Sequence, residues 1–154
     1  MDYDVLILGG GLIGCAVAYE LSKYSLNIAL IEKDYDIADD VALVNSSIIF
    51  DGIQTKDNIM SKLEYMGMNM VKDLAKKFDV PYKSVGSLII AKNEKEEKEI
   101  NEIYNKAIEN GIPNIHILEK DEIKKLEPNL NINATKAVYS KNTGVICPYD
   151  LAIA

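Results

Sequence analysis

Residues 3–33 constrain the fold of this chain most strongly, because a cluster of glycines separates two short apolar runs. Residues 5–8 are apolar and lead into three consecutive glycines at 9–11, a pattern typical of a buried parallel strand that enters a tight turn. The segment that follows has apolar residues on most sides and predicts a helix. Residues 28–31 form a second apolar run, so the stretch predicts a strand–helix–strand unit.

The glycines and one acidic residue have the spacing of a dinucleotide-binding site. Gly9 permits a sharp turn, Gly11 allows a pyrophosphate to approach the backbone, and Gly14 allows close packing of helix on strand. The free amides at a helix start can hold the phosphates. Glu32 follows the second strand, where it can accept hydrogen bonds from ribose hydroxyls and would repel a 2′-phosphate, which disfavours NADP. Glycines that serve packing alone are the alternative interpretation.

The same stretch carries a family resemblance. Residues 4–21 read DVLILGGGLIGCAVAYEL, and the sequence Ile-Glu-Lys follows at 31–33. Together they resemble the amino-terminal FAD-binding motif of the superfamily of D-amino-acid oxidase and glycerol-3-phosphate dehydrogenase. The resemblance implies a Rossmann-type α/β fold and favours FAD over NAD, which spacing alone does not decide. The cofactor-binding residues that we predict are Gly9, Gly11, Leu12, Ile13, Gly14, Glu32, Lys33, Asn45 and Ser46.

The segment around Asn45 matches the family only in part. Asn45 and Ser46 agree with it, whereas Val41 and Ala42 stand where the family has hydroxyl residues and Phe50 stands where it often has a histidine. Direct hydroxyl contacts to the phosphates and any role of that histidine are therefore not expected here. A local Asx-type turn is the alternative interpretation of Asn45 and Ser46.

Apolar periodicity predicts the elements of the remaining chain. In a helix over residues 57–79, one continuous apolar stripe is expected to face the core, and it consists of Ile59, Leu63, Met66, Met70, Leu74 and Phe78. The other expected elements are strands over 82–85, 87–91, 114–118 and 134–140, a helix over 92–110 and a short helix over 119–126. His116, the only histidine, is expected to be a satisfied or exposed strand residue rather than a catalytic base.

Later motifs keep the order of the family, so the resemblance spans the chain. They are Gly86-Ser87-Leu88, Glu127-Pro128 and Gly144-Val145-Ile146-Cys147-Pro148. The resemblance implies an incomplete FAD-binding portion at 1–78, the start of an α+β substrate domain at 79–143, and a return to the FAD-binding domain at 144–154. The helix at 148–154 stops after about one turn without a cap, so we expect an amino-terminal part of a longer enzyme, inactive by itself.

Composition limits the partners. Acidic residues number 24 against 17 basic ones, which argues against a nucleic-acid or phospholipid surface. No apolar run has the length and flanks of a transmembrane segment or signal peptide, so we expect a cytoplasmic protein and leave peripheral membrane association open. Cys15 and Cys147 lack metal or redox spacing and are expected to be buried thiols, and no metal site is predicted.

The resemblance implies an FAD-dependent enzyme that passes a hydride from a small-molecule substrate to flavin, and the glycerol-3-phosphate dehydrogenase branch is nearest. No catalytic residue or electron acceptor is identified. One alternative is an oxidase or dehydrogenase of amino acids or 2-hydroxy acids. A carboxylate-binding arginine downstream of this stretch would favour it, and the 154 residues themselves contain no arginine. The other alternative is a non-catalytic nucleotide-binding domain.

Overall fold

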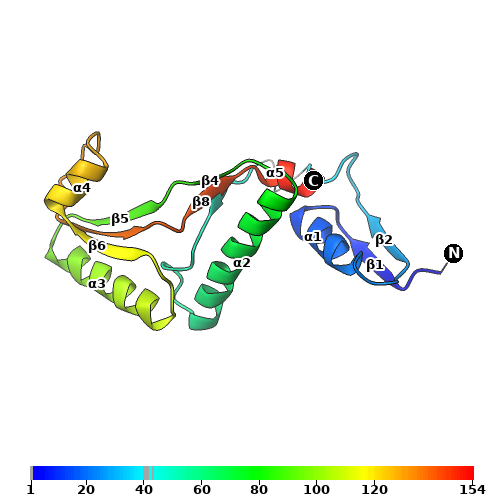
Figure 1. Ribbon diagram of the computed structural model, residues 1–154, viewed down its shortest axis with the longest axis horizontal. Helices are drawn as coiled ribbons and strands as arrows, with labels where there is room; N and C mark the ends of the chain where they lie inside the picture. The colour runs from blue at the N-terminus through cyan, green and yellow to red at the C-terminus, as the bar shows by residue number, and fades with distance from the viewer. Residues whose placement is uncertain (1, 40–41, 43) are drawn as a thin grey trace. The chain divides into compact units, whose positions relative to one another are not determined.

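The chain divides into two compact units in the computed structural model, which describes residues 2–39, 42 and 44–154 (Figure 1). Unit 1 comprises Met1–Ile48, Leu74–Tyr82 and Ile146–Ala154, and unit 2 comprises Ile49–Asp73 and Lys83–Val145. Residues 49–73 thus belong to unit 2. The domain bounds that the family resemblance implies stay a prediction. None of the helices in the described part of the chain is both long and apolar enough to cross a membrane.

Unit 1 begins with the predicted strand–helix–strand. Strand β1 (Val5–Leu8) pairs in parallel with β2 (Ile28–Ile31), and helix α1 (Leu12–Leu21) connects the two strands. The register places Val5 opposite Ile28, so the two strands end together. Helix α5 (Pro148–Ile153), from the far end of the sequence, packs against α1. The α/β start that the sequence predicted is therefore confirmed.

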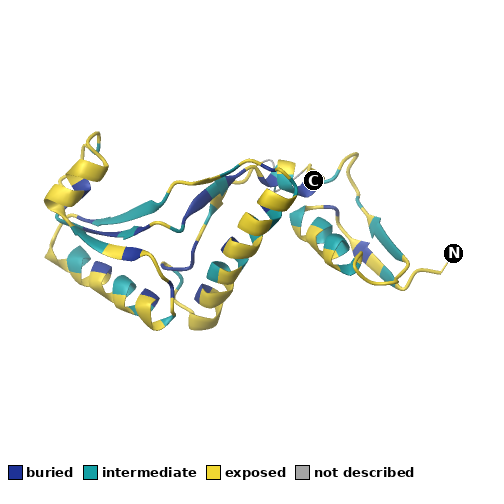
Figure 2. Cartoon of the chain, viewed as in Figure 1, coloured by how far each residue is buried: buried dark blue, intermediate teal, exposed yellow. Residues whose placement is uncertain are grey.

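Unit 2 is built on an antiparallel sheet with a helix on each face. Its strands β5 (Ser87–Ala91), β7 (Lys136–Ser140) and β6 (Ile115–Glu119) have the order β5-β7-β6. Helix α3 (Glu94–Glu109) packs on the face that carries Val138, and α4 (Lys120–Leu126) packs on the face of Ala137. Side chains of a strand alternate between the two faces, so neighbouring residues of β7 are buried in two separate cores (Figure 2).

A second sheet holds three short strands. They are β3 (Ile48–Ile49), β8 (Gly144–Ile146) and β4 (Tyr82–Ser84), in the order β3-β8-β4. Gly86 has a φ of +72° and separates β4 from β5, as the sequence predicted. The two predicted strands around this glycine thus exist, but they belong to different sheets.

A buried polar network holds the segment after β3 within unit 2. The carboxylate of Asp51 accepts a hydrogen bond from the hydroxyl of Ser140, and both residues are buried. The hydroxyl of Ser61 donates to the carbonyl oxygen of Gly52 at 2.9 Å and accepts a bond from the side-chain amide of Asn110 at 3.1 Å. Buried polar groups are stable only when they are paired in this way, so the network fixes the backbone at 51–52.

The longest helix, α2 (Asn58–Lys77), confirms the predicted helix but not the predicted face. The side chain of Asp57 accepts the amide of Met60 at 2.8 Å and caps the helix start, as expected. Four of the six residues expected in the core are instead exposed, namely Ile59, Leu63, Met66 and Met70. Leu74 and Phe78 are half-buried, and the ring of Phe78 meets that of Tyr19 edge to face at 5.2 Å. Periodicity reveals an apolar face but does not show what covers it.

Candidate functional site

The turn between β1 and α1 is fastened to the end of β2. The amide of Gly9 donates to the carbonyl oxygen of Ile31 at 2.7 Å. Gly9 has a φ of +106°, a conformation that residues with a side chain rarely adopt. The sharp turn that the sequence assigned to Gly9 is therefore present, and it brings the start of α1 to the carboxyl edge of the parallel strands.

Gly14 and Gly11 differ in the space around them. A Cβ atom at Gly14 would lie 1.9 Å from the carbonyl oxygen of Gly9, so α1 approaches the turn more closely than any side chain would allow. At Gly11 a Cβ atom would meet no atom within 4 Å. One glycine thus permits close packing, and the other leaves the backbone open to a ligand.

Glu32 closes the other side of the turn. Its Oε2 atom accepts the amide of Gly10 at 2.6 Å, and its Oε1 atom accepts the amides of Lys33 at 2.6 Å and Asp34 at 3.0 Å. These bonds favour the charged form and hold the pKa of Glu32 below its usual value, with the amide of Asp34 contributing most. A carboxylate has about four acceptor positions, so Oε2 keeps capacity for a hydroxyl group of a ligand.

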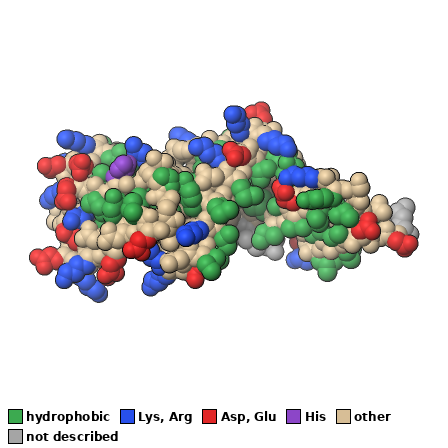
Figure 3. All heavy atoms as spheres, turned by 60° about the horizontal axis from the view of Figure 1, so that its bottom comes forward, with side chains coloured by type: hydrophobic (Ala, Val, Ile, Leu, Met, Phe, Trp, Pro, Cys, Tyr) green, Lys and Arg blue, Asp and Glu red, His purple; other side chains and the backbone are tan. Residues whose placement is uncertain are grey.

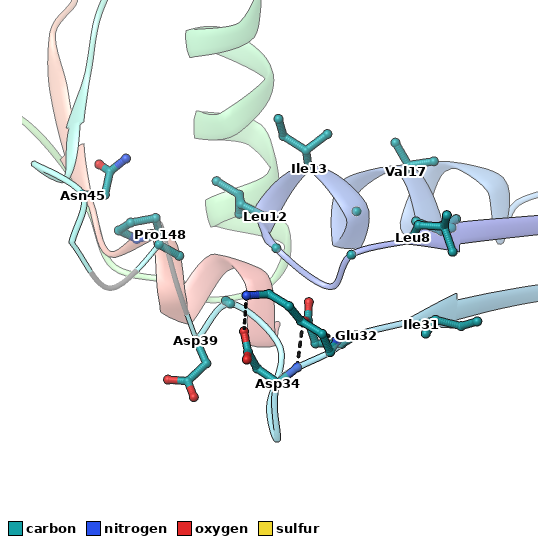
Figure 4. Close-up of a pocket in the computed structure, with 17 residues that line it drawn as sticks. Leu8, Leu12, Ile13, Val17, Ile31, Glu32, Asp34, Asp39, Asn45 and Pro148 are labelled. Carbon is teal, nitrogen blue, oxygen red and sulfur yellow. Dashed lines mark hydrogen bonds and ion pairs between the residues drawn. The ribbon is translucent and has the colours of Figure 1, made fainter.

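A pocket of about 930 Å³ lies within unit 1 at this turn (Figure 4). Its volume falls in the range of small-molecule and cofactor sites. Of the nine residues predicted from the sequence, eight line it: Gly9, Gly11, Leu12, Ile13, Gly14, Glu32, Lys33 and Asn45. Figure 4 shows Leu12 and Ile13 at the start of α1 and Glu32 after β2. The apolar side chains provide most of the wall, and the acid and the amides provide its polar groups.

The segment around Asn45 contributes less to the pocket than its family motif suggested. Asn45 lines the pocket, and its side-chain oxygen also accepts the amide of Ser47 at 2.8 Å, which forms the local Asx turn of the alternative interpretation. Ser46 is exposed and does not line the pocket. Ala42 does line it, and Val41 lies outside the described residues.

Nine of the residues that line the pocket were not among the predicted site residues, and two of these nine are Ala38 and Pro148. Ala38 is 2% exposed, and its amide donates to the carbonyl oxygen of Gly10 at 2.9 Å. Pro148 reaches the pocket from the start of α5. A backbone hydrogen bond leaves no signal in residue types, so sequence patterns could not identify Ala38. The place of Pro148 in the family motif was the only available hint.

The two cysteines differ in their exposure to solvent. The thiol of Cys15 in α1 lies 3.4 Å from the carbonyl oxygen of Gly10, and burial raises its pKa, so it remains neutral beside the turn. The prediction of two buried thiols was wrong, because Cys15 is only partly buried and Cys147 is exposed. The position directly before the first turn of α5 leaves its side chain in solvent.

Comparisons with known proteins show which family this chain belongs to. The model of the family described as FAD dependent oxidoreductase matches residues 4–154. The glycerol 3-phosphate dehydrogenase of Caloramator mitchellensis is 40% identical over 153 residues, which cover 99% of this chain and 32% of that protein. The mitochondrial L-2-hydroxyglutarate dehydrogenase of Dictyostelium discoideum is 35% identical over 148 residues, which cover 94% of this chain and 33% of that protein.

One solved structure is similar to nearly the whole of this chain. The dithionite-reduced L-α-glycerophosphate oxidase of Mycoplasma pneumoniae with FAD bound has a TM-score of 0.88 and 32% identity to this chain. The similarity covers 99% of this chain and 41% of that one. The chain thus spans about a third of the length of the curated relatives it matches.

Proposed function

Because this chain belongs to the family of FAD-dependent oxidoreductases, we propose that the pocket of unit 1 holds the adenosine and pyrophosphate part of FAD. The observation that carries the proposal is the contrast at one turn between Gly14, which has no space for a Cβ atom, and Gly11, where that space is open. When bound, FAD supplies the acceptor for the two electrons of a C–H bond that is oxidised.

Residues of this chain provide two kinds of contact in the proposal. The amides at the start of α1 face the pyrophosphate, and α1 has no acidic residue in its first turn that would oppose an anion there. The free acceptor capacity of Glu32 takes a ribose hydroxyl. Lys33 and Asn45 add polar groups to the same pocket. Ser46 stays a prediction from the family motif alone.

We further propose that the whole protein oxidises glycerol 3-phosphate. The support is the 40% identity to a glycerol 3-phosphate dehydrogenase and the fold shared with a glycerophosphate oxidase. In this proposal unit 1 belongs to the FAD-binding domain and unit 2 begins the substrate domain, while the location is cytoplasmic. The second candidate substrate is L-2-hydroxyglutarate, favoured by the 35% identity to a dehydrogenase of that acid.

The test uses the protein purified at its natural length. Its absorption spectrum is recorded for flavin bands, and then glycerol 3-phosphate or L-2-hydroxyglutarate is added without oxygen. Bleaching by glycerol 3-phosphate alone supports the first candidate, and bleaching by the hydroxy acid alone supports the second. A colourless protein that takes up no added FAD contradicts the flavoenzyme proposal and leaves a non-catalytic nucleotide-binding domain.

A further inference from the structure

A second pocket, of about 650 Å³, lies within unit 2 on the α4 side of the sheet. His116 on β6 pairs in register with Tyr139 on β7. Leu118 and Ala137 belong to the core under α4. His116 and Tyr139 each lie two positions away from these residues along the same strands, so the four side chains share one face of the sheet. The paired His116 and Tyr139 line the pocket on this face.

Two lysines give this pocket a positive balance. Lys125 comes from α4, and Lys141 directly follows β7. Neither forms an ion pair with any residue that the structure describes. Among the described lining residues the one carboxylate is Glu122, whose Oε2 atom accepts the amide of Glu119 at 2.9 Å in the capping box of α4. Two lysines thus stand against one acid, whereas the chain as a whole has a formal net charge of −7.

The same pocket holds two further donors and an apolar wall. The hydroxyl of Tyr139 and the imidazole of His116 have no hydrogen-bond partner within the described part of the chain. Tyr139 is half-buried, and a tyrosine in such a place usually pairs its hydroxyl. Leu118 and Leu126 supply apolar surface beside these groups. Figure 3 shows the only histidine, in purple, open to solvent beside hydrophobic side chains.

We propose that this pocket binds a small organic oxyanion, either a carboxylate or a phosphate monoester on a short carbon chain. The two lysines donate charge-assisted hydrogen bonds to the oxyanion, and such bonds are about twice as strong as neutral ones. The tyrosine hydroxyl and the imidazole N–H donate to its remaining lone pairs. The two leucines contact the carbon chain. Because the pocket lies within unit 2, the proposal does not depend on FAD binding in unit 1.

The imidazole of His116 provides a local probe, because the chain contains one histidine. The ¹⁵N-labelled chain, without a histidine tag, is titrated with butyl phosphate, butyrate or butanol at constant pH and ionic strength. NMR follows the ring signals of His116 and the amide signals of residues 139–141. At least one of the two anions should give saturable shifts, and butanol should give none. The ratio of the two affinities shows whether the ligand is a phosphate or a carboxylate.

Variants separate a built site from a merely basic surface. Lys125→Gln with Lys141→Gln should weaken binding at least tenfold, because each lysine provides a charge-assisted hydrogen bond. Tyr139→Phe keeps the ring and removes the hydroxyl, so it should weaken binding about two- to tenfold. Lys95→Gln with Lys98→Gln on α3 is the matched control, since it lowers the net charge by the same two units at exposed positions. This control should bind like the wild type, and both lysine variants should keep its melting temperature.

The proposal is overturned if neither anion gives a saturable shift, or if butanol moves the signals as the anions do. It is also overturned if the double variant at Lys125 and Lys141 binds as tightly as the wild type, or if the control on α3 loses binding equally. All of these titrations are made without flavin, so a failure here is distinct from a failure of the FAD proposal.

Discussion

Replacement of Gly14 by alanine isolates the close approach on which the nucleotide turn depends. The new Cβ atom would lie 1.9 Å from the carbonyl oxygen of Gly9, and both positions are fixed by backbone, so no side chain can rotate away. Overpacking of this kind costs up to about 3 kcal/mol, while alanine gains about 1 kcal/mol over glycine inside a helix. We therefore expect Gly14→Ala to lower the free energy of unfolding of unit 1 by about 2 kcal/mol.

Gly67 in α2 supplies the matched control, because a Cβ atom there would meet no atom within 4 Å. Gly67→Ala should raise the free energy of unfolding of unit 2 by about 1 kcal/mol through helix propensity alone. Urea unfolding followed by circular dichroism measures both changes, and hydrogen exchange of peptides from each unit assigns them. If Gly14→Ala stabilised the chain as Gly67→Ala does, the close approach of α1 to the turn would be refuted.

Three further substitutions test other parts of the account. Gly11→Ala should leave the melting temperature unchanged but weaken FAD binding at least tenfold in a fluorescence titration, since its Cβ atom meets no protein atom and would occupy the ligand space. The lowered pKa of Glu32 adds stability above its unfolded value of 4.5, and this stability is lost as pH falls through the lower folded pKa. Glu32→Gln should therefore reduce the difference in unfolding free energy between about pH 7 and about pH 3 in urea titrations. Ser140→Ala removes a hydrogen-bond donor from the buried carboxylate of Asp51 and should cost about 1–3 kcal/mol in the same assay; an unchanged midpoint would contradict a structural role for this pair.

The sequence predicted the nucleotide turn well because its requirements are local. A glycine at positive φ, a glycine in a close contact and an acid after the next strand are each visible as a residue type at a fixed spacing. The parallel pairing of β1 and β2 and helix α1 between them are confirmed. The family is confirmed as well, since its model matches residues 4–154.

Long-range pairing was harder to predict. The strands on either side of Gly86 were expected, yet β4 and β5 join different sheets, which depends on distant partners. The apolar stripe of α2 was expected in a core, but four of its six residues are exposed. Periodicity shows that a helix face is apolar, and it does not show which element covers that face. Ala38 reached the pocket through a backbone hydrogen bond that no pattern of residue types reveals.

The central claim is that the pocket of unit 1 binds FAD, and an NMR titration of the ¹⁵N-labelled chain with FAD tests it most directly. The account predicts saturable shifts of the amide signals of residues 9–14 and 32–34, which line or border the pocket. ADP should compete, because it carries the adenosine and pyrophosphate part alone. Amide signals that do not move, or shifts confined to residues 83–145 of unit 2, would contradict the account.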